Sequence, residues 1–366
     1  EWVSLTWAQV GEEATLLAAG LIALGSESEQ RVAIAGDTSM KWILADLGIA
    51  LAGGAVTTVY SSTGAEDVAY ILSDSNSHIL FAENEGQLAK VLEQRDNLPE
   101  LHKVVLFEGE GDGDFSISLD ALRELGREAL AADPNLVKER AAAVRPDHLA
   151  TLIYTSGTTG KPKGVEIIQE SWGYCGEALS SLGVMSADDV QLLWLPMAHV
   201  FGSVLLTCQI ELGFMTAVDG RVPKIMENCA VIKPTFMGAV PRIFEKVHAA
   251  ITAMARAGGT EKVEGLAWGV SVGQRYHQAE IDGVEPDEAL KAEYKMADEL
   301  VLSTIRGALG GNIRFFISGS APLSADISEF FAAAGMPVLE GYGLTETSAI
   351  VTICRPGTRR GGYVGE

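Results

Sequence analysis

The chain has 366 residues, 47% of them apolar, so it is long enough to bury a core of two or three layers. Its 27 basic and 49 acidic residues give a formal net charge of −22, which argues against nucleic acids and anionic membrane surfaces as partners. An anionic ligand would therefore need a local cationic pocket.

The four cysteines lie far apart and form no C-x-x-C pair, so we expect no structural zinc. Unpaired, widely spaced cysteines are typical of a reducing compartment, and we expect a cytoplasmic protein. The apolar run 16–24 is too short to span a bilayer, and Asp46 and the glycine pair at 53–54 interrupt the run 42–60. Peripheral membrane contact and the oligomeric state stay open.

The first third of the chain alternates between two patterns. Short runs rich in β-branched residues predict strands, and the stretches between them have helical spacing. This alternation predicts βα units and a largely parallel sheet. The predicted strands are 32–35, 55–59, 79–82 and 104–107, and the predicted helices are 38–52, 65–73, 85–95 and 118–144.

A buried strand is predicted at Leu149–Tyr154, and a loop rich in glycine, hydroxyl groups and lysine follows it. Glycines let backbone N–H groups point inward, hydroxyl groups donate hydrogen bonds to phosphoryl oxygens, and lysines neutralise charge. This composition predicts a phosphate-binding loop. Its residues are Thr155, Ser156, Gly157, Thr158, Thr159, Gly160, Lys161, Pro162, Lys163 and Gly164.

The loop differs from the P-loop of nucleoside triphosphatases at two positions. Thr155 stands where that motif has its first glycine, and Pro162 stands where it has the serine or threonine that holds magnesium. Pro162 also biases Lys161 towards an extended conformation, so a helix cannot begin at once. We therefore expect a phosphate loop of another kind, with a plain surface loop as the alternative.

The second half repeats the α/β pattern and adds a helical segment. Strands are predicted near 190–194, 214–218, 235–238 and 313–317, and helices near 203–212 and 222–232. Residues 240–309 have helical spacing almost throughout, broken at 258–259 and 283. Two stacked α/β layers with a long helical insert are therefore predicted.

Four motifs together resemble those of the adenylate-forming enzymes, which include acyl-CoA synthetases, adenylation domains of peptide synthetases and firefly luciferase. They occur in the order of that family along nearly the whole chain. A fifth segment, 240–246, most resembles the long-chain acyl-CoA synthetases. The motifs are the phosphate loop 155–165, Leu195-Pro-Met-Ala-His-Val-Phe-Gly202, Gly319-Ser-Ala-Pro-Leu323 and Glu340-Gly-Tyr-Gly-Leu-Thr-Glu-Thr347.

The resemblance implies that residues 1–366 are most of a large AMP-binding domain. It implies a first α/β subdomain over about 52–185, a second over 1–51 and 186–340 with the insert 240–309, and the start of a small β-barrel subdomain over 341–366. The small C-terminal domain, with the ribose-binding aspartate, the hinge and the adenylating lysine, is expected beyond Glu366.

The reaction that this resemblance implies uses ATP, Mg²⁺ and coenzyme A to convert a carboxylic acid, here a long-chain fatty acid, into acyl-AMP and then a thioester. The loop would hold the β- and γ-phosphates, with Lys161 or Lys163 offsetting charge on the leaving pyrophosphate. Thr345 would contact the α-phosphate, and Glu346 would bind Mg²⁺. Taken alone, Thr345-Glu346 could be the start of a helix with an acidic first turn.

The remaining site residues are also assigned by resemblance. Tyr342 would stack on adenine between Gly341 and Gly343, with Glu340 beside them and Gly319, Ser320 and Ala321 as the opposite wall; a core tyrosine is the alternative. His199 would separate the carboxylate and nucleotide sites rather than act as a base, although a lone histidine in an apolar segment is often a core residue. The acyl pocket would involve Phe201, Met237 and Gly238, but apolar residues at such spacing are often core.

Three other interpretations remain. Gly269-Val-Ser-Val-Gly273 matches the nucleophile elbow of serine hydrolases, but its surroundings predict a helix where the elbow needs a preceding strand. The chain could also be a non-catalytic nucleotide- and acyl-binding fragment, or an acyl-AMP ligase or another acid-activating family member. Residues 166–172 depart from the sequence that often follows the loop in this family, so the helix expected there could pack differently.

Overall fold

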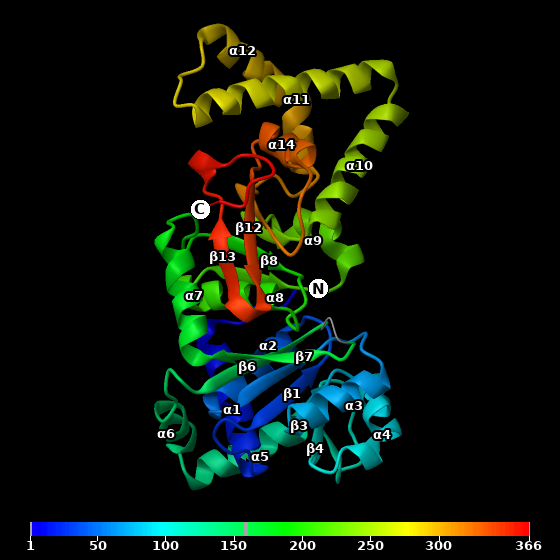
Figure 1. Cartoon of the computed structure of the whole chain (residues 1–366), viewed down its shortest axis with the longest axis vertical. Coiled ribbons are helices and arrows are strands. Elements are labelled where there is room, and N and C mark those ends of the chain that lie inside the picture. Colours follow the sequence, from blue (N-terminus) through cyan, green and yellow to red (C-terminus); the bar gives the residue numbers. More distant parts are fainter. Residues whose placement is uncertain (1, 157–159, 366) are drawn as a thin grey trace. The chain divides into compact units, whose positions relative to one another are not determined.

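The computed structural model describes residues 2–156 and 160–365, and these residues fall into two compact units. Unit 1 comprises residues 1–174 and 196–203, and unit 2 comprises residues 175–195 and 204–366 (Figure 1). Each unit has a sheet dominated by parallel strands with helices packed on it. The predicted mixed α/β fold with two layered sheets is therefore confirmed.

In the described part of unit 1, seven strands form one sheet in the order β5-β4-β3-β1-β2-β6-β7. Strands β1 to β6 run parallel, and β7 is antiparallel to β6. The central strands are almost fully buried, as expected for a parallel sheet covered on both faces. The strands are β1 (Arg31–Ala35), β2 (Ala55–Val59), β3 (Ser77–Ala82), β4 (Lys103–Leu106), β5 (Ser116–Ser118), β6 (Leu149–Thr155) and β7 (Lys163–Ile168).

Two groups of helices pack in unit 1. Helices α3 (Ala65–Asp74) and α4 (Glu85–Glu93) contribute apolar side chains to a core that they share with β1 to β4 and β6. The other group packs together through α1 (Trp7–Ala23), which contacts α2 (Met40–Leu51), α5 (Leu119–Ala132) and α6 (Leu136–Ala142). At the α1–α5 contact Gly20 and Gly126 allow the backbones to meet, since a Cβ at Gly126 would lie 2.1 Å from the Leu16 carbonyl oxygen.

The structure differs from the expected subdomain boundary over the first 51 residues. The resemblance implies that they belong to the second subdomain, but β1 pairs with both β2 and β3 in the middle of the unit 1 sheet. Strands β1 and β2 enclose a helix in an ordinary βαβ unit, and such a unit cannot be divided between two sheets. Residues 196–203 also return to unit 1, which no local pattern predicted.

Two predicted helices differ from the structure for local reasons. The helix expected over 118–144 is divided into α5 and α6, because Pro134 cannot continue α5 and clashes with the preceding turn. After the phosphate loop the chain forms strand β7 before helix α7 (Gln169–Ser181) begins. Residues 163–168 form β7, which pairs with β6. The segment 166–172, which departs from the usual family sequence, therefore starts in a strand rather than a helix.

Within the described residues of unit 2, six strands take the order β13-β12-β11-β10-β8-β9. Strands β8 to β12 are parallel, and β13 is antiparallel to β12. The predicted strands all lie in this sheet. They are β8 (Val190–Leu193), β9 (Met215–Val218), β10 (Phe236–Ala239), β11 (Phe315–Ser318), β12 (Val338–Leu344) and β13 (Ala349–Ile353).

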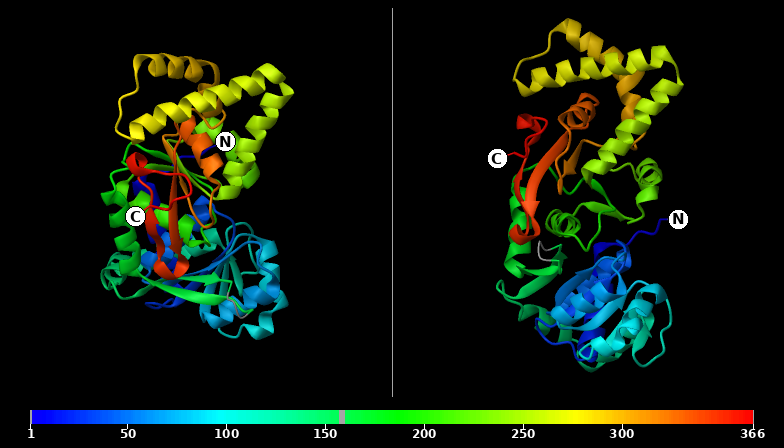
Figure 2. Two further views of the ribbon diagram at one scale, coloured as in Figure 1. Left: turned by 45° about the horizontal axis from the view of Figure 1, so that its top comes forward. Right: turned by 45° about the vertical axis from the view of Figure 1, so that its right-hand side comes forward.

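The helical insert is confirmed, including its breaks. In Figure 2 helices α10, α11 and α12 form a group beyond the end of the sheet, and α11 also contacts α14. The breaks fall at Gly259 and Gly283, both with positive φ. The helices of this part of the chain are α8 (Val200–Leu212), α9 (Ile225–Ile232), α10 (Pro241–Ala257), α11 (Thr260–Ile281), α12 (Glu288–Ala297), α13 (Ser303–Gly307) and α14 (Ala325–Ala333).

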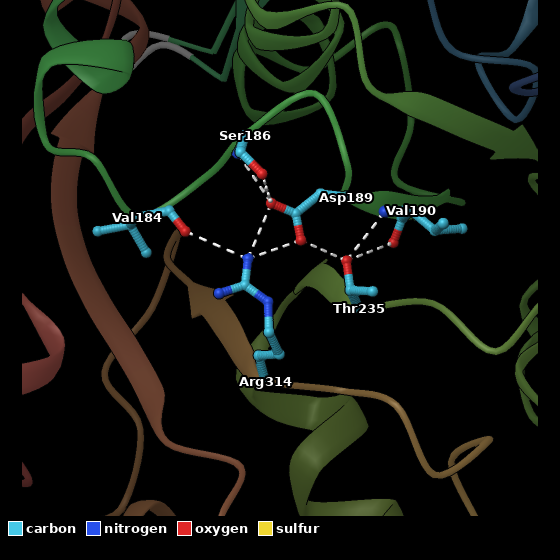
Figure 3. A network of polar contacts seen from close by, with 6 residues as sticks. All are labelled: Val184, Ser186, Asp189, Val190, Thr235 and Arg314. Carbon is cyan, nitrogen blue, oxygen red and sulfur yellow. Dashed lines mark hydrogen bonds and ion pairs between the residues drawn. The ribbon is translucent and has the colours of Figure 1, made fainter.

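One buried carboxylate, Asp189, joins the amino ends of three strands in unit 2 (Figure 3). It lies before β8 and accepts hydrogen bonds from Arg314, before β11, at 2.6 and 2.8 Å, and from the Thr235 hydroxyl, before β10, at 2.5 Å. The Ser186 N–H donates to it at 2.8 Å. Burial acts to raise the pKa of Asp189, but these hydrogen bonds and the Arg314 charge outweigh it and hold the pKa below its usual value.

The expected boundary at 341 is also not a break in the structure. Strand β12 pairs with β11 at its start and with β13 beyond residue 340, so one strand joins the sheet to the β12–β13 hairpin. The segment 341–366 belongs to unit 2. Its assignment as the start of a separate β-barrel subdomain stays a prediction.

Candidate active site

The predicted phosphate loop lies between β6 and β7, two strands of unit 1 that pair with each other antiparallel. Thr155 at the end of β6 pairs with Lys163 at the start of β7, and Tyr154 pairs with Gly164. Gly157, Thr158 and Thr159 lie outside the described residues. An antiparallel strand follows the loop where a P-loop would have a helix, which agrees with the exclusion of a P-loop from Pro162.

Tyr70 of α3 contacts the loop on its carboxyl side. Its hydroxyl donates a hydrogen bond to the Pro162 carbonyl at 3.1 Å, and the Lys161 ammonium lies 5.0 Å from its ring centroid. This is within the range of a cation–π contact. Tyr70 thus contacts two consecutive loop residues. The loop residues that are exposed to solvent include Ser156, Gly160, Lys161 and Lys163.

Tyr154 supports the other side of the hairpin. Its hydroxyl donates to Asp74 Oδ2 at 2.7 Å, and burial together with this carboxylate raises the pKa of Tyr154. A Cβ at Gly164 would lie 3.0 Å from Tyr154 Cζ, so a glycine lets the ring lie against β7. Tyr70 and Tyr154 also meet edge to face at 6.5 Å. The contacts of Tyr70 and Tyr154 therefore hold the hairpin against α3.

The segment 196–203, with the predicted residues His199 and Phe201, is fastened within unit 1 by two threonines. The Met197 N–H donates to the Thr38 hydroxyl at 3.0 Å, and the buried Thr58 hydroxyl donates to the Ala198 carbonyl at 3.2 Å. Thr58 lies in β2, next to β6. The predicted gate residue and the phosphate-loop hairpin thus belong to the same unit.

His199 is half-buried at the start of α8, and its ring is oriented by the backbone. Its Nδ1 accepts a hydrogen bond from the Phe201 N–H at 3.1 Å, so the neutral ring carries its proton on Nε2. Burial lowers the pKa of His199 below its usual value, which keeps the ring neutral at pH 7. A neutral ring with an N–H at Nε2 can donate a hydrogen bond, and this fits a wall or gate better than a base.

The predicted walls of the adenine site meet at one end of the unit 2 sheet. Ser318 of β11 pairs with Glu340 of β12, so Gly319-Ser320-Ala321 and Gly341-Tyr342-Gly343 continue from adjacent strands. Ser320 has φ +70°, a left-handed conformation that costs a non-glycine residue on the order of 1 kcal/mol or more. The structure therefore places these two predicted segments side by side.

The glycines flanking Tyr342 have a structural reason that the sequence did not show. A Cβ at Gly343 would lie 1.5 Å from the Ala349 carbonyl oxygen, and one at Gly341 would lie 3.1 Å from that of Thr352. Both glycines therefore let β13 approach β12. Tyr342 itself is 49% exposed, which excludes the alternative that it is a core tyrosine and leaves its ring available.

Glu340 is buried and engaged with the protein itself. Its carboxylate accepts hydrogen bonds from the Ser328 hydroxyl and the Gly362 N–H, both at 3.2 Å, and Ser328 in turn accepts one from Arg359 at 3.1 Å. These contacts hold the segment after β13 against α14. A direct role in cofactor binding stays a prediction for this residue, and its visible role is structural.

Thr345, Glu346 and Thr347 form a short 3-10 turn at the tip of the β12–β13 hairpin. The Thr347 hydroxyl caps it by accepting from the Leu344 N–H at 3.0 Å. Thr345 is buried, while Glu346 is exposed. The alternative of a helix start with an acidic first turn thus describes the local backbone. The Glu346 carboxylate is still accessible in this conformation.

The predicted acyl-pocket residues are core residues within their own units. Phe201 is buried in unit 1, and Met237 and Gly238 are buried in β10 of unit 2, between β8 and β11. The alternative that such apolar residues are plain core therefore describes their surroundings. Gly238 pairs with Ile317, one residue before Ser318, so it lies near the same end of the sheet as the predicted adenine walls.

Two residues near the predicted site were missed by sequence reasoning. Tyr70 lies 92 residues before Pro162, and its position on an amphipathic helix gave no functional signal. The buried Ser318 hydroxyl has no hydrogen-bond partner among the described residues, although a buried hydroxyl normally finds one. Its place directly before the Gly-Ser-Ala motif was the available signal.

The hydrolase interpretation is excluded by the structure. Ser271 lies inside helix α11, which runs without interruption from residue 260 to 281, so no strand precedes it.

Among the described residues, no helix combines the length and the apolar character that a bilayer crossing needs.

Comparison with known proteins identifies relatives along the whole chain. Residues 1–365 match the AMP-binding enzyme family. The long-chain-fatty-acid–CoA ligase FadD15 of Mycobacterium bovis is 33% identical over 100% of this chain and 60% of its own length. The long-chain-fatty-acid–CoA ligase ACSBG2 of Rattus norvegicus is 30% identical over 96% of this chain and 54% of its own. The chain thus spans about 60% or less of these relatives.

Solved structures share the fold. The fatty acyl CoA synthetase of Mycobacterium tuberculosis aligns over 99% of this chain and 59% of its own, with a TM-score of 0.68 and 22% identity. The anthranilate CoA ligase AuaEII, solved with anthranoyl-AMP, aligns over 99% and 58%, with a TM-score of 0.69 and 20% identity. With the motifs, the two sheets and the family match in agreement, the chain belongs to the AMP-binding enzyme family.

Proposed function

We propose that this chain is the nucleotide- and acyl-binding part of an AMP-forming long-chain fatty acid–CoA ligase. The observation that carries the proposal is the pairing of β6 with β7 on either side of a segment rich in glycine and hydroxyl groups, together with the exposed Lys161 and Lys163 that end this segment. The kinship with long-chain fatty acid–CoA ligases supports the substrate class. The remaining partners in this proposal are ATP and coenzyme A, and the site of action is the cytoplasm.

In the proposed first step a carboxylate oxygen attacks the α-phosphorus of ATP. The bond between that phosphorus and the bridging oxygen breaks, and pyrophosphate leaves with the electron pair. Lys161 and Lys163 would offset the negative charge on the β- and γ-phosphates, and the hydroxyl groups of Thr155 and Ser156 would donate to their oxygens. In the second step the coenzyme A thiol attacks the acyl carbon, AMP leaves, and the thiol proton passes to solvent.

Glu346 fits a role in holding Mg²⁺ with the phosphates. Its carboxylate is exposed and makes no hydrogen bond or ion pair with any residue that the structure describes. Magnesium usually takes one or two carboxylates together with phosphate oxygens and water, so a single accessible carboxylate is enough. Bound there, the ion would neutralise phosphate charge, while Thr345 at the same turn would face the α-phosphate.

His199 and Tyr342 would orient the substrates. The ring of His199, neutral and fixed by the Phe201 N–H, would present its Nε2–H to an oxygen without competing for its proton. Tyr342 would stack on adenine with its exposed ring. Neither residue needs to move a proton, because the attacking carboxylate is already ionised at neutral pH.

The test is calorimetric binding of two non-hydrolysable acyl-sulfamoyl-adenosines, one with a palmitoyl and one with an acetyl chain. The measurement needs no turnover, and sulfamoyl-adenosine without an acyl group serves as the control. Tighter binding of the palmitoyl compound would support both adenylate binding and a long-chain substrate. Equal binding of the two would support another acid-activating member of the family, and absence of binding would refute the proposal for this chain.

A further inference from the structure

Two histidines and a glutamate form a cluster at the amino ends of β3 and β4 in unit 1, outside the predicted active site. His78 is the second residue of β3, His102 immediately precedes β4, and Glu100 lies in the link that leads to it. One ligand atom from each of these three side chains lies within 4.8 Å of the other two. The backbone holds the histidines in register, because the His102 N–H donates to the His78 carbonyl at 2.8 Å.

We propose that His78, Glu100 and His102 form a surface binding site for a divalent transition-metal ion such as Zn²⁺. Two imidazole nitrogens and one carboxylate oxygen are a donor set that suits Zn²⁺, and also Cu²⁺ and Ni²⁺. Three protein ligands with a fourth position open to water is a common arrangement for zinc. Magnesium is disfavoured, because it requires oxygen ligands.

The geometry needs little change to hold the ion. In a tetrahedral zinc site the donor atoms lie roughly 3.4 Å apart, given metal–ligand distances of about 2.0–2.1 Å. The observed separations are within 4.8 Å, and Glu100 and His102 are exposed, so rotation of these side chains can close the gap. The two rings are tilted by 51° with centroids 5.3 Å apart, so they are not stacked face to face.

His78 is partly buried, whereas Glu100 and His102 are exposed. The Asn76 side-chain amide contacts His78 Nε2 at 3.3 Å, and a metal ion bound at that nitrogen would displace this weak hydrogen bond. Metal binding would replace this contact with a stronger one.

The site is separate from the proposed catalytic chemistry. Strands β3, β1, β2 and β6 run parallel, with His78 at the amino end of β3 and Thr155 at the carboxyl end of β6. The metal would thus lie at the amino ends of these strands, whereas the phosphate loop follows the carboxyl end of β6. Its expected effect is to clip β3 to the link before β4, and so to stabilise the folded chain.

The experiment titrates Zn²⁺ into the metal-free chain by calorimetry, in a buffer without phosphate. We expect about one equivalent to bind, excess Mg²⁺ not to compete, and the melting temperature to rise with Zn²⁺. Co²⁺ provides a second readout, because tetrahedral Co²⁺ with imidazole ligands has visible absorption bands. Glu100→Gln and His102→Gln should each weaken Zn²⁺ binding by at least about tenfold.

His277→Gln is the matched control, since it removes an imidazole that pairs with Glu280 but belongs to no three-ligand cluster among the described residues. This variant should bind Zn²⁺ as the parent chain does. Because Glu100 and His102 are exposed, their variants should keep the parent melting temperature without metal. No saturable Zn²⁺ binding, or binding that survives both substitutions, would overturn the proposal.

Discussion

The two hairpins that carry the predicted nucleotide-binding residues are held in different ways. The β6–β7 hairpin of unit 1 is supported by side-chain contacts with helix α3, since Tyr70 of α3 donates a hydrogen bond to Pro162 and Tyr154 of β6 donates one to Asp74 of α3. The β12–β13 hairpin of unit 2 is held by backbone proximity, which Gly341 and Gly343 permit. Similar density of glycine in two motifs thus has different causes, and a motif glycine is not by itself evidence of ligand contact.

Gly343→Ala tests whether close backbone approach holds the β12–β13 hairpin together. Its Cβ would lie 1.5 Å from the Ala349 carbonyl oxygen, so β12 and β13 would have to separate. We expect a loss of at least about 3 kcal/mol in the free energy of unfolding, measured by urea denaturation. Gly341→Ala is the control, with a nearest contact of 3.1 Å and an expected loss of about 1 kcal/mol. Equal losses would contradict the backbone-proximity argument.

A baseline comes from a region of unit 2 that contains no predicted site residue, the Asp189 network. Asp189→Asn removes the charge that Arg314 and Thr235 contact, and we expect a loss of about 2 kcal/mol at pH 7, since Arg314 is half-exposed. Asp188→Asn, at the exposed neighbouring position, should have almost no effect.

The pH dependence checks the same network. The pKa of Asp189 is lowered from 3.8, so its stabilising contribution is fully present above about pH 4 and is lost as the pH falls through the folded-state pKa. The stability difference between the parent chain and Asp189→Asn should therefore shrink in acid. A difference that is constant from pH 7 to pH 3 would show that the charge is not involved.

Glu346→Gln tests whether the tip of the β12–β13 hairpin binds metal rather than only forming a turn. Loss of the carboxylate should weaken binding of Mg²⁺-ATP by about tenfold, since one magnesium ligand is lost. Adenosine, which carries no phosphate, should bind the variant and the parent equally in calorimetry. The same loss for both ligands would refute the proposed metal role of Glu346.

The smallest expected effect concerns the support of the β6–β7 hairpin. Tyr70→Phe keeps the ring under Lys161 but removes the hydrogen bond to the Pro162 carbonyl, and we expect a loss of about 1 kcal/mol. Tyr70→Leu removes both contacts, and it should also weaken ATP binding severalfold by releasing Lys161. ATP affinity identical in the parent and the leucine variant would show that Tyr70 only packs.

Much of the fold could be predicted from the sequence because its signals are local. The strand–helix alternation before residue 107 and the glycine breaks of the helical insert depend on neighbouring residues. The division of the chain into units could not be predicted, because the pairing of β1 with β2 and β3 is a long-range choice. Strand β7 was missed because its pairing with β6 outweighs its weak local pattern.

The candidate site was predictable where a motif is contiguous and unpredictable where it is assembled. Residues 155–164, 319–321 and 340–347 could be read from short segments. Tyr70 could not, since its contact with Pro162 joins positions 92 residues apart. The buried engagement of Glu340 with Ser328 and Gly362 was likewise invisible, because it depends on how the end of β13 returns to α14.

The segment 196–203 has a consequence for the order in which the protein is made. Unit 1 contains residues from both sides of the stretch 175–195, which belongs to unit 2, and hydrogen bonds of Thr38 with Met197 and of Thr58 with Ala198 join its two parts. During synthesis the first 174 residues can form their sheet, but they cannot complete these contacts until residue 203 has left the ribosome. A chain stopped between 174 and 196 should therefore have the sheet of unit 1 but lack the hydrogen bonds that fasten the segment 196–203 to it.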